Sequence, residues 1–182
     1  MILLVLGIAL WWAGHLFKRV LPGVRARLGE PGKGVAALLI VAGIVLMVLG
    51  FRAAVREPVF APPIWGRHLN NLAMLLAVIL LGMGNSKGKL RAWLRHPMLT
   101  GVLVWALAHL LVNGDRPSLV LFGSMGIWAV VEMVVINATQ GPWQRPQPGP
   151  IGGDVRLVLG SLVGFAVIAA IHTWLGYYPF PG

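Results

Sequence analysis

Three histidines lie inside apolar stretches of this sequence, and they are its strongest candidates for chemistry. His15, His109 and His172 each occur within a run of aliphatic and aromatic residues. An imidazole in such a setting needs a partner, because burying a polar group without a hydrogen bond in hydrocarbon is costly. Ionisable residues inside membrane spans therefore mark candidate functional sites.

Each of these histidines lies on a stripe of residues spaced by four, which share one face of a helix. The stripes also contain Gly101, Trp105 and Asn113 for His109, Gly7 and Trp11 for His15, and Gly160 and Gly164 for His172. Small residues beside an imidazole could leave room for a flat group, and haem b needs only one or two neutral imidazoles. Interhelical hydrogen bonds by the histidines, with glycines that only allow helix packing, are the structural alternative.

Other cofactors are less well supported by the residue types. The chain has no cysteine, which excludes disulfides, thiolate catalysis, Fe–S clusters and covalent c-type haem. Zinc prefers three or four close ligands, usually including carboxylate or thiolate, and the sequence shows no such cluster.

Two acids add to the candidate set. Glu132 is the only acid inside an apolar run, so it must be protonated, paired or in contact with water. Its expected depth matches that of His15, which it could orient by a hydrogen bond, and pairing with Arg19 is the alternative. Asp115 is expected to cap the helix that begins near Pro117. The alternative is a role at the entrance to a substrate-binding site.

The elements that position these residues are predicted to be six membrane helices. Of the 182 residues, 58% are hydrophobic and 11% charged, whereas a soluble domain has roughly 25% charged residues. Six apolar runs, at about 1–20, 34–55, 68–84, 97–113, 117–137 and 155–175, each approach the roughly 20 residues that span a bilayer. We therefore expect an all-α, polytopic membrane protein, a single domain over residues 1–182, with a long irregular loop at 138–154. Gly43 with Gly50, and Gly160 with Gly164, are expected at helix contacts.

The basic residues predict the orientation of this bundle. Eleven of the 15 Lys and Arg residues fall in the first, third and fifth connections, which the positive-inside rule places in the cytoplasm. Both termini are then expected in the periplasm, with the lipid bilayer as the immediate partner. The net charge of +10 is explained by topology, and no basic stripe with interleaved aromatics indicates a nucleic-acid partner.

The central segment of the chain resembles the NnrU family. The resemblance rests on Arg95-His96-Pro97-Met98-Leu99-Thr100-Gly101, Trp105-Ala106-Leu107-Ala108-His109-Leu110-Leu111, Asn113-Gly114-Asp115 and Leu121-Phe122-Gly123, with weaker support from Gly14-His15-Leu16 and His172. It implies a bacterial inner-membrane protein linked to denitrification, that is, to nitrite and nitric oxide reductase activity. The family is similar to plant zeta-carotene isomerase, a membrane enzyme with haem b.

Carried over from that isomerase, the two haem-ligand histidines fall on His109 and His15, and its RHP histidine falls on His96. The isomerase has cysteine where this chain has Ala106, so a ligand switch through that thiolate is excluded here. His109 and His15 are expected at different depths, which makes His172 or His68 the alternative second ligand. The resemblance therefore implies a protein that binds haem b and acts either as an isomerase-like enzyme or as a redox accessory. Trp105 and Asn113 are expected beside the cofactor.

The sequence allows two other functions, and it does not decide whether the chain is an enzyme. Arg95-His96-Pro97 also resembles a motif of intramembrane methyltransferases and reductases, although Leu99 stands where those proteins usually have tyrosine. A non-catalytic assembly factor for respiratory reductases is the second alternative. The expected partners are accordingly a hydrophobic small molecule or components of a respiratory reductase.

Overall fold

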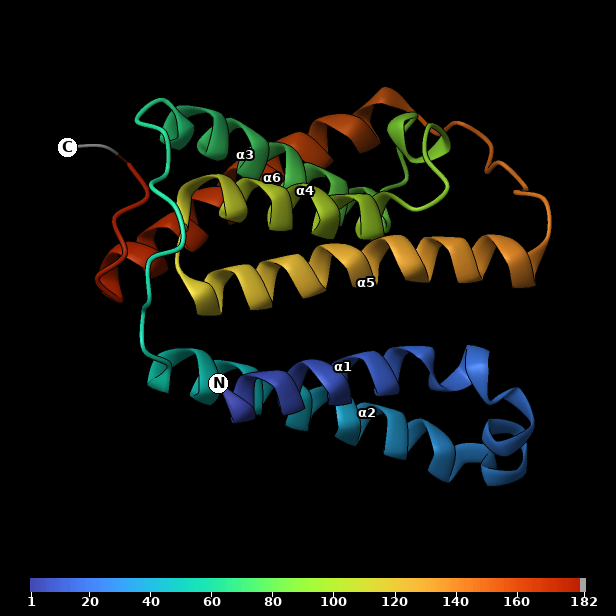
Figure 1. Cartoon of the computed structure of the whole chain (residues 1–182). Coiled ribbons are helices and arrows are strands. Elements are labelled where there is room, and N and C mark those ends of the chain that lie inside the picture. Colours follow the sequence, from blue (N-terminus) through green and yellow to red (C-terminus); the bar gives the residue numbers. More distant parts are fainter. Residues whose placement is uncertain (181–182) are drawn as a thin grey trace. The chain divides into compact units, whose positions relative to one another are not determined.

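Six α-helices make up most of the chain, of which this computed structural model describes residues 1–180 (Figure 1). The elements in chain order are α1 (Ile2–Val20), α2 (Pro22–Ala53), α3 (Gly66–Met83), the one-turn 3-10 helix η1 (Leu90–Ala92), α4 (Pro97–Val112), α5 (Arg116–Gln140) and α6 (Ile151–Trp174). The six predicted apolar runs are thus confirmed as helices. The all-α fold is confirmed with them, and the one β-bridge among the described residues joins Pro58 to Asp115.

Length and exposure identify these helices as membrane-spanning. Five of them are long and apolar enough to cross a bilayer, and α4, with 16 residues, is shorter. Large apolar side chains project outward from them, with Leu38 70%, Leu72 67% and Val163 65% exposed. Apolar surface of this extent is stable only against lipid or protein. The chain is therefore a multi-pass membrane protein.

The first of two compact units contains α1, α2 and α5 and covers Met1–Ala61 and Gly114–Gly141. Glycines allow α1 and α2 to pack backbone to backbone. A Cβ added at Gly43 would lie 2.8 Å from the carbonyl oxygen of Gly7 and 2.9 Å from the amide nitrogen of Trp11. A Cβ at Gly50 would collide with the backbone of Leu4. The predicted contact role of Gly43 and Gly50 is confirmed.

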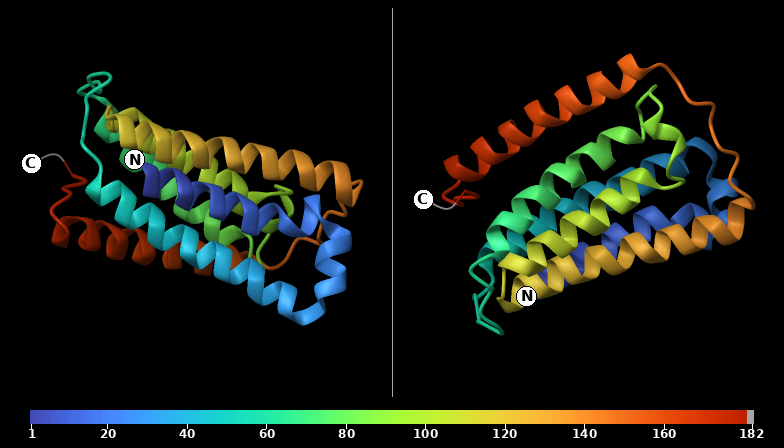
Figure 2. Two further views of the ribbon diagram at one scale, coloured as in Figure 1. Left: turned by 60° about the horizontal axis from the view of Figure 1, so that its bottom comes forward. Right: turned by 90° about the horizontal axis from the view of Figure 1, so that it is seen from above.

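The second unit contains α3, η1, α4 and α6 and covers Pro62–Asn113 and the chain from Pro142 onward. Helix α3 packs against both α4 and α6 (Figure 2). Leu80 and Met83 of α3 form a buried apolar cluster with Leu157 of α6. Exposed Trp65 before α3 and Trp174 at the end of α6 suit the interfacial region of a bilayer, where tryptophan is enriched.

Three sequence expectations about the elements are wrong. Helix α2 begins at Pro22, not near residue 34, although Gly29 at φ +56° breaks it. The loop between α5 and α6 is shorter than expected, because α5 continues to Gln140 and α6 already starts at Ile151. Gly160 makes no helix contact, since no atom of the described chain lies within 4 Å of the position of its Cβ.

Candidate functional site

Each of the three embedded histidines makes the same kind of hydrogen bond, from Nδ1 to the backbone carbonyl oxygen four residues earlier. This bond determines the tautomer of each ring. Nδ1 of His15 lies 3.0 Å from the carbonyl oxygen of Trp11, Nδ1 of His109 lies 2.9 Å from that of Trp105, and Nδ1 of His172 lies 2.8 Å from that of Ile168. A carbonyl oxygen only accepts, so Nδ1 must carry the hydrogen in each case. The lone pair of each neutral imidazole is then on Nε2, the atom that ligates a metal in this tautomer.

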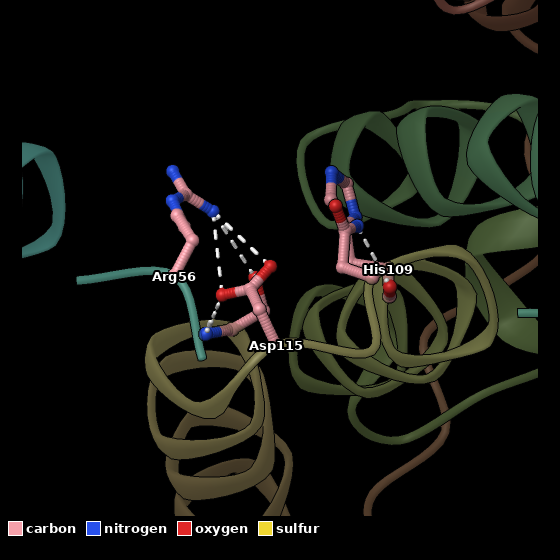
Figure 3. Close-up of polar contacts among 5 residues, drawn as sticks. Arg56, His109 and Asp115 are labelled. Carbon is pink, nitrogen blue, oxygen red and sulfur yellow. Dashed lines mark hydrogen bonds and ion pairs between the residues drawn. The ribbon is translucent and has the colours of Figure 1, made fainter. Parts of the chain in front are cut away.

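His109 is half-buried in the second unit, in the second half of α4. Its ring centroid lies 5.1 Å from that of Trp105, whose carbonyl accepts its Nδ1–H (Figure 3). Asn113 Nδ2 donates to the carbonyl of His109 at 2.8 Å and so helps to end the helix. Ala106, three residues before His109 on α4, is fully buried. The side chain is thus held in one rotamer by its own helix.

Gly101, on the same stripe of α4, serves helix packing. A Cβ there would lie 3.0 Å from the carbonyl oxygen of Ala77 and 3.1 Å from the amide nitrogen of Leu81, both on α3. The space beside this glycine is therefore filled by α3 and is not open to a flat ligand. Any flat group at His109 must lie along the part of the stripe nearer to Trp105 and Asn113.

The other two embedded histidines differ in their surroundings. His172 is half-buried on α6 in the second unit, close enough to His109 to interact with it electrostatically. His15 belongs to the first unit, where its ring centroid lies 4.1 Å from that of Trp11 and 4.8 Å from that of Trp128. The indoles of α1 and α5 therefore cover the His15 imidazole.

Glu132 is paired with Arg19, one of the two partners expected from the sequence. Arg19 Nε donates to Glu132 Oε1 at 2.7 Å, and the Glu132 side chain is only 5% exposed. Glu132 Oε2 has no hydrogen-bond partner in the described chain, so the alternative bond from His15 is not formed. Trp11, His15 and Arg19 follow one another at intervals of four on α1 and face Trp128 and Glu132 of α5.

The Arg95-His96-Pro97 motif forms the start of α4. Pro97 takes the first helical position, where its missing N–H is of no consequence. His96 is the N-cap residue, and its carbonyl accepts both the amide and the hydroxyl of Thr100 at 2.9 Å. The motif therefore has a structural explanation at the helix start that involves no cofactor.

Asp115 caps α5, as the sequence predicts. Its carboxylate accepts the amide of Ser118 at 3.0 Å and the hydroxyl of Ser118 at 2.8 Å (Figure 3). Arg56 Nη1 also approaches Asp115 at 3.3 Å, while its guanidinium lies 4.2 Å from the ring centroid of Phe51. These contacts fasten the segment after α2 to the start of α5, and they account for Asp115 without a substrate.

One functional-looking acid was missed by the sequence analysis. Asp154, in the first turn of α6, is 7% exposed and accepts the amides of Lys89 at 2.9 Å and Leu90 at 3.0 Å. It thus caps η1 from another helix, and Gly88 is needed because a Cβ there would collide with the Asp154 carboxylate. In the sequence, the only sign of this role is that Asp154 lies at the edge of an apolar run. The amides that its carboxylate binds are known only from the fold.

The donor types fit haem better than a metal ion bound by protein alone. Among residues 1–180 no group of three or more His, Asp or Glu side chains is placed to hold a metal ion. A neutral imidazole with a fixed Nδ1–H is by contrast a donor that would hold the iron of haem through Nε2. The chain offers three such groups, His109 and His172 in the second unit and His15 in the first.

Comparison with known proteins decides the family. The family model described as NnrU protein matches residues 3–179, nearly the whole chain. The chain belongs to the NnrU family. Neither the search of curated proteins nor the search of solved structures gave a significant match. The resemblance expected from the Arg95–Gly123 segment is thereby confirmed at the level of the NnrU family.

Proposed function

We propose that this NnrU-family protein binds haem b non-covalently in the bacterial inner membrane, and that His109 would hold the iron. The hydrogen bond from His109 Nδ1 to the Trp105 carbonyl supports the proposal, because it orients the ring and makes Nε2 the nitrogen that would ligate iron in the neutral imidazole. The half-buried position of His109 in an apolar helix would supply the low-polarity surroundings that haem b prefers.

The proposed biological role rests on membership of the NnrU family. NnrU proteins are associated with denitrification, so we propose that this chain supports nitrite or nitric oxide reduction as a redox or isomerase-like accessory. Haem b, when bound, supplies one-electron chemistry or Lewis-acid polarisation of a ligand. Trp105 would then cover one side of the group, and Asn113 would hold the backbone of His109 in place.

Haem content tests this proposal directly. Wild-type protein made in haem-replete cells is expected to show a Soret band and about one haem per chain or per pair of chains. His109→Ala is expected to lose most of the haem or to shift the Soret band, because the imidazole that would hold the iron is gone. His96→Ala is the matched control and should keep the spectrum, since His96 serves the start of α4 through its backbone carbonyl.

Two further variants identify the second ligand. His172→Ala should change the haem spectrum if both ligands come from the second unit, and His15→Ala should do so if the pairing carried over from the isomerase holds. A colourless wild-type protein would overturn haem binding and favour an assembly factor. An unchanged spectrum of His109→Ala would overturn the ligand assignment alone.

We also propose that both termini face the periplasm. The basic side chains concentrate between Lys18 and Lys33, around the junction of α1 and α2, and in the α3–α4 connection, and such regions stay in the cytoplasm. Reporter fusions after Lys89 should therefore be active only with a cytoplasmic reporter, and fusions at the C-terminus only with a periplasmic one. A C-terminal fusion that is active in the cytoplasm would reverse the orientation.

A further inference from the structure

The connection between α1 and α2 is a closed corner. Gly29, at φ +56°, separates a short helical stretch, Pro22–Leu28, from the rest of α2, and we call this stretch the corner segment. Arg25 Nη1 donates to the carbonyl of Gly29 at 2.6 Å. A Cβ at Gly32 would lie only 3.0 Å from Arg25 Nη1, so the corner segment folds back closely on the start of the long part of α2.

The corner segment is amphipathic, although it lies outside the apolar runs. Leu21, Val24 and Leu28 are 49%, 46% and 40% exposed. Leu21 directly precedes the helical segment, and at about 100° per residue Val24 and Leu28 fall within an arc of about 40° on it. Arg25 and Arg27 flank that arc on its two sides. Long basic side chains beside an apolar arc are the pattern of a helix that lies in a membrane interface.

The corner also carries positive charge that the protein does not neutralise. Arg19 is paired with Glu132, and Lys33 is paired with Glu30 at 2.7 Å. In the described chain no carboxylate pairs with Lys18, Arg25 or Arg27. An anionic partner would therefore be stabilised there by three cationic side chains.

The position of the corner along the chain indicates which class of anion would bind to these cationic side chains. The membrane helix α1 ends at Val20 and the apolar part of α2 begins soon after Gly32, so the corner segment lies where the chain leaves and re-enters the bilayer. We propose that the corner segment lies flat in the headgroup layer and binds anionic phospholipid, with Leu21, Val24 and Leu28 against the acyl chains and the cations on the phosphates.

Lipid titration of the purified full-length protein tests the proposal. Native mass spectrometry in detergent, with added dioleoylphosphatidylglycerol or dioleoylphosphatidylcholine, measures the dissociation constant of the first lipid bound. Lys18→Gln with Arg27→Gln should weaken phosphatidylglycerol binding about 25-fold, or about five-fold for each cation removed. Phosphatidylcholine binding should not change. Both side chains are exposed, so the double variant is expected to fold, and circular dichroism is the measurement that checks this.

Arg52→Gln with Arg67→Gln is the matched control, because it removes the same net charge from two exposed arginines elsewhere in the chain. It should keep wild-type affinity for phosphatidylglycerol. An equal loss in both double variants would show a general charge effect and overturn the site, as would unchanged binding in Lys18→Gln with Arg27→Gln. Displacement of phosphatidylglycerol by inorganic phosphate in the millimolar range would show a soluble-anion site instead of a lipid surface.

Discussion

Glu132→Leu is expected to destabilise the protein by about 3 kcal/mol, because it leaves the guanidinium of Arg19 buried without its carboxylate. Arg19 Nε lies 2.7 Å from Glu132 Oε1, and the two side chains are 19% and 5% exposed. Glu132→Gln keeps an oxygen acceptor for Arg19 and should cost less, about 1–2 kcal/mol. Unfolding by SDS in mixed micelles, followed by tryptophan fluorescence, measures both values, since Trp128 lies one turn before Glu132.

The double variant Arg19→Leu with Glu132→Leu separates the pair from general packing. Replacing both members of a buried ion pair by apolar side chains is often nearly neutral, so the double variant should be more stable than Glu132→Leu alone. Equal stability of wild type, Glu132→Leu and Glu132→Gln would contradict a buried pair. A double variant as unstable as the sum of the two single variants would show that the side chains do not interact.

The sequence left the partner of Glu132 open because depth alone does not decide it. His15 and Arg19 are one turn apart on α1 and both lie within reach of a carboxylate on a neighbouring helix. The choice depends on side-chain length and on the ring neighbours of His15. Trp11 and Trp128 pack around the imidazole, whose Nδ1–H is already bonded to the Trp11 carbonyl, while the longer Arg19 reaches Glu132.

Hydropathy was sufficient to predict the six helices, but it did not predict that α2 starts at Pro22. The apolar run predicted from the sequence starts at about residue 34, after both Pro22 and Pro31. Pro22 instead occupies the first turn of α2, and Pro31 comes two residues after the break at Gly29, so it again lies in a first turn. A proline in a first turn loses no hydrogen bond, because the N–H there has no helical partner. Only the positive φ of Gly29 reveals the break, and no residue type reports it reliably.

The histidine stripes were predictable, but the role of their glycines was not. Spacing by four correctly places Gly101, Trp105 and His109 along one side of α4. Whether a glycine leaves a slot or admits a neighbouring backbone depends on how the helix is rotated, which the sequence does not specify. Gly101 contacts α3, whereas Gly160 faces open space on α6. The hydrogen bond that each embedded histidine makes to the carbonyl four residues earlier depends on the side-chain rotamer, so it could be recognised only in the structure.

Gly43→Val is expected to destabilise the first unit by about 3 kcal/mol or to prevent its folding, because overpacking of a close backbone contact forces the helices apart. The first carbon of any side chain at this position would lie 2.8 Å from the Gly7 carbonyl oxygen and 2.9 Å from the Trp11 amide nitrogen. Neither backbone atom can turn aside as a flexible side chain could. Thermal unfolding in detergent measures the loss, and Gly43→Ala should show the same effect at smaller size.

Gly160→Val is the control for Gly43→Val, since it makes the same change in volume in another apolar helix. No described atom lies within 4 Å of a Cβ at Gly160, so the added side chain meets lipid or detergent and stability should stay within about 0.5 kcal/mol of wild type. Equal destabilisation by the two valines would mean that α6 packs on its glycine face in the membrane. Wild-type stability of Gly43→Val would mean that α1 and α2 do not rest on each other through Gly7 and Gly43.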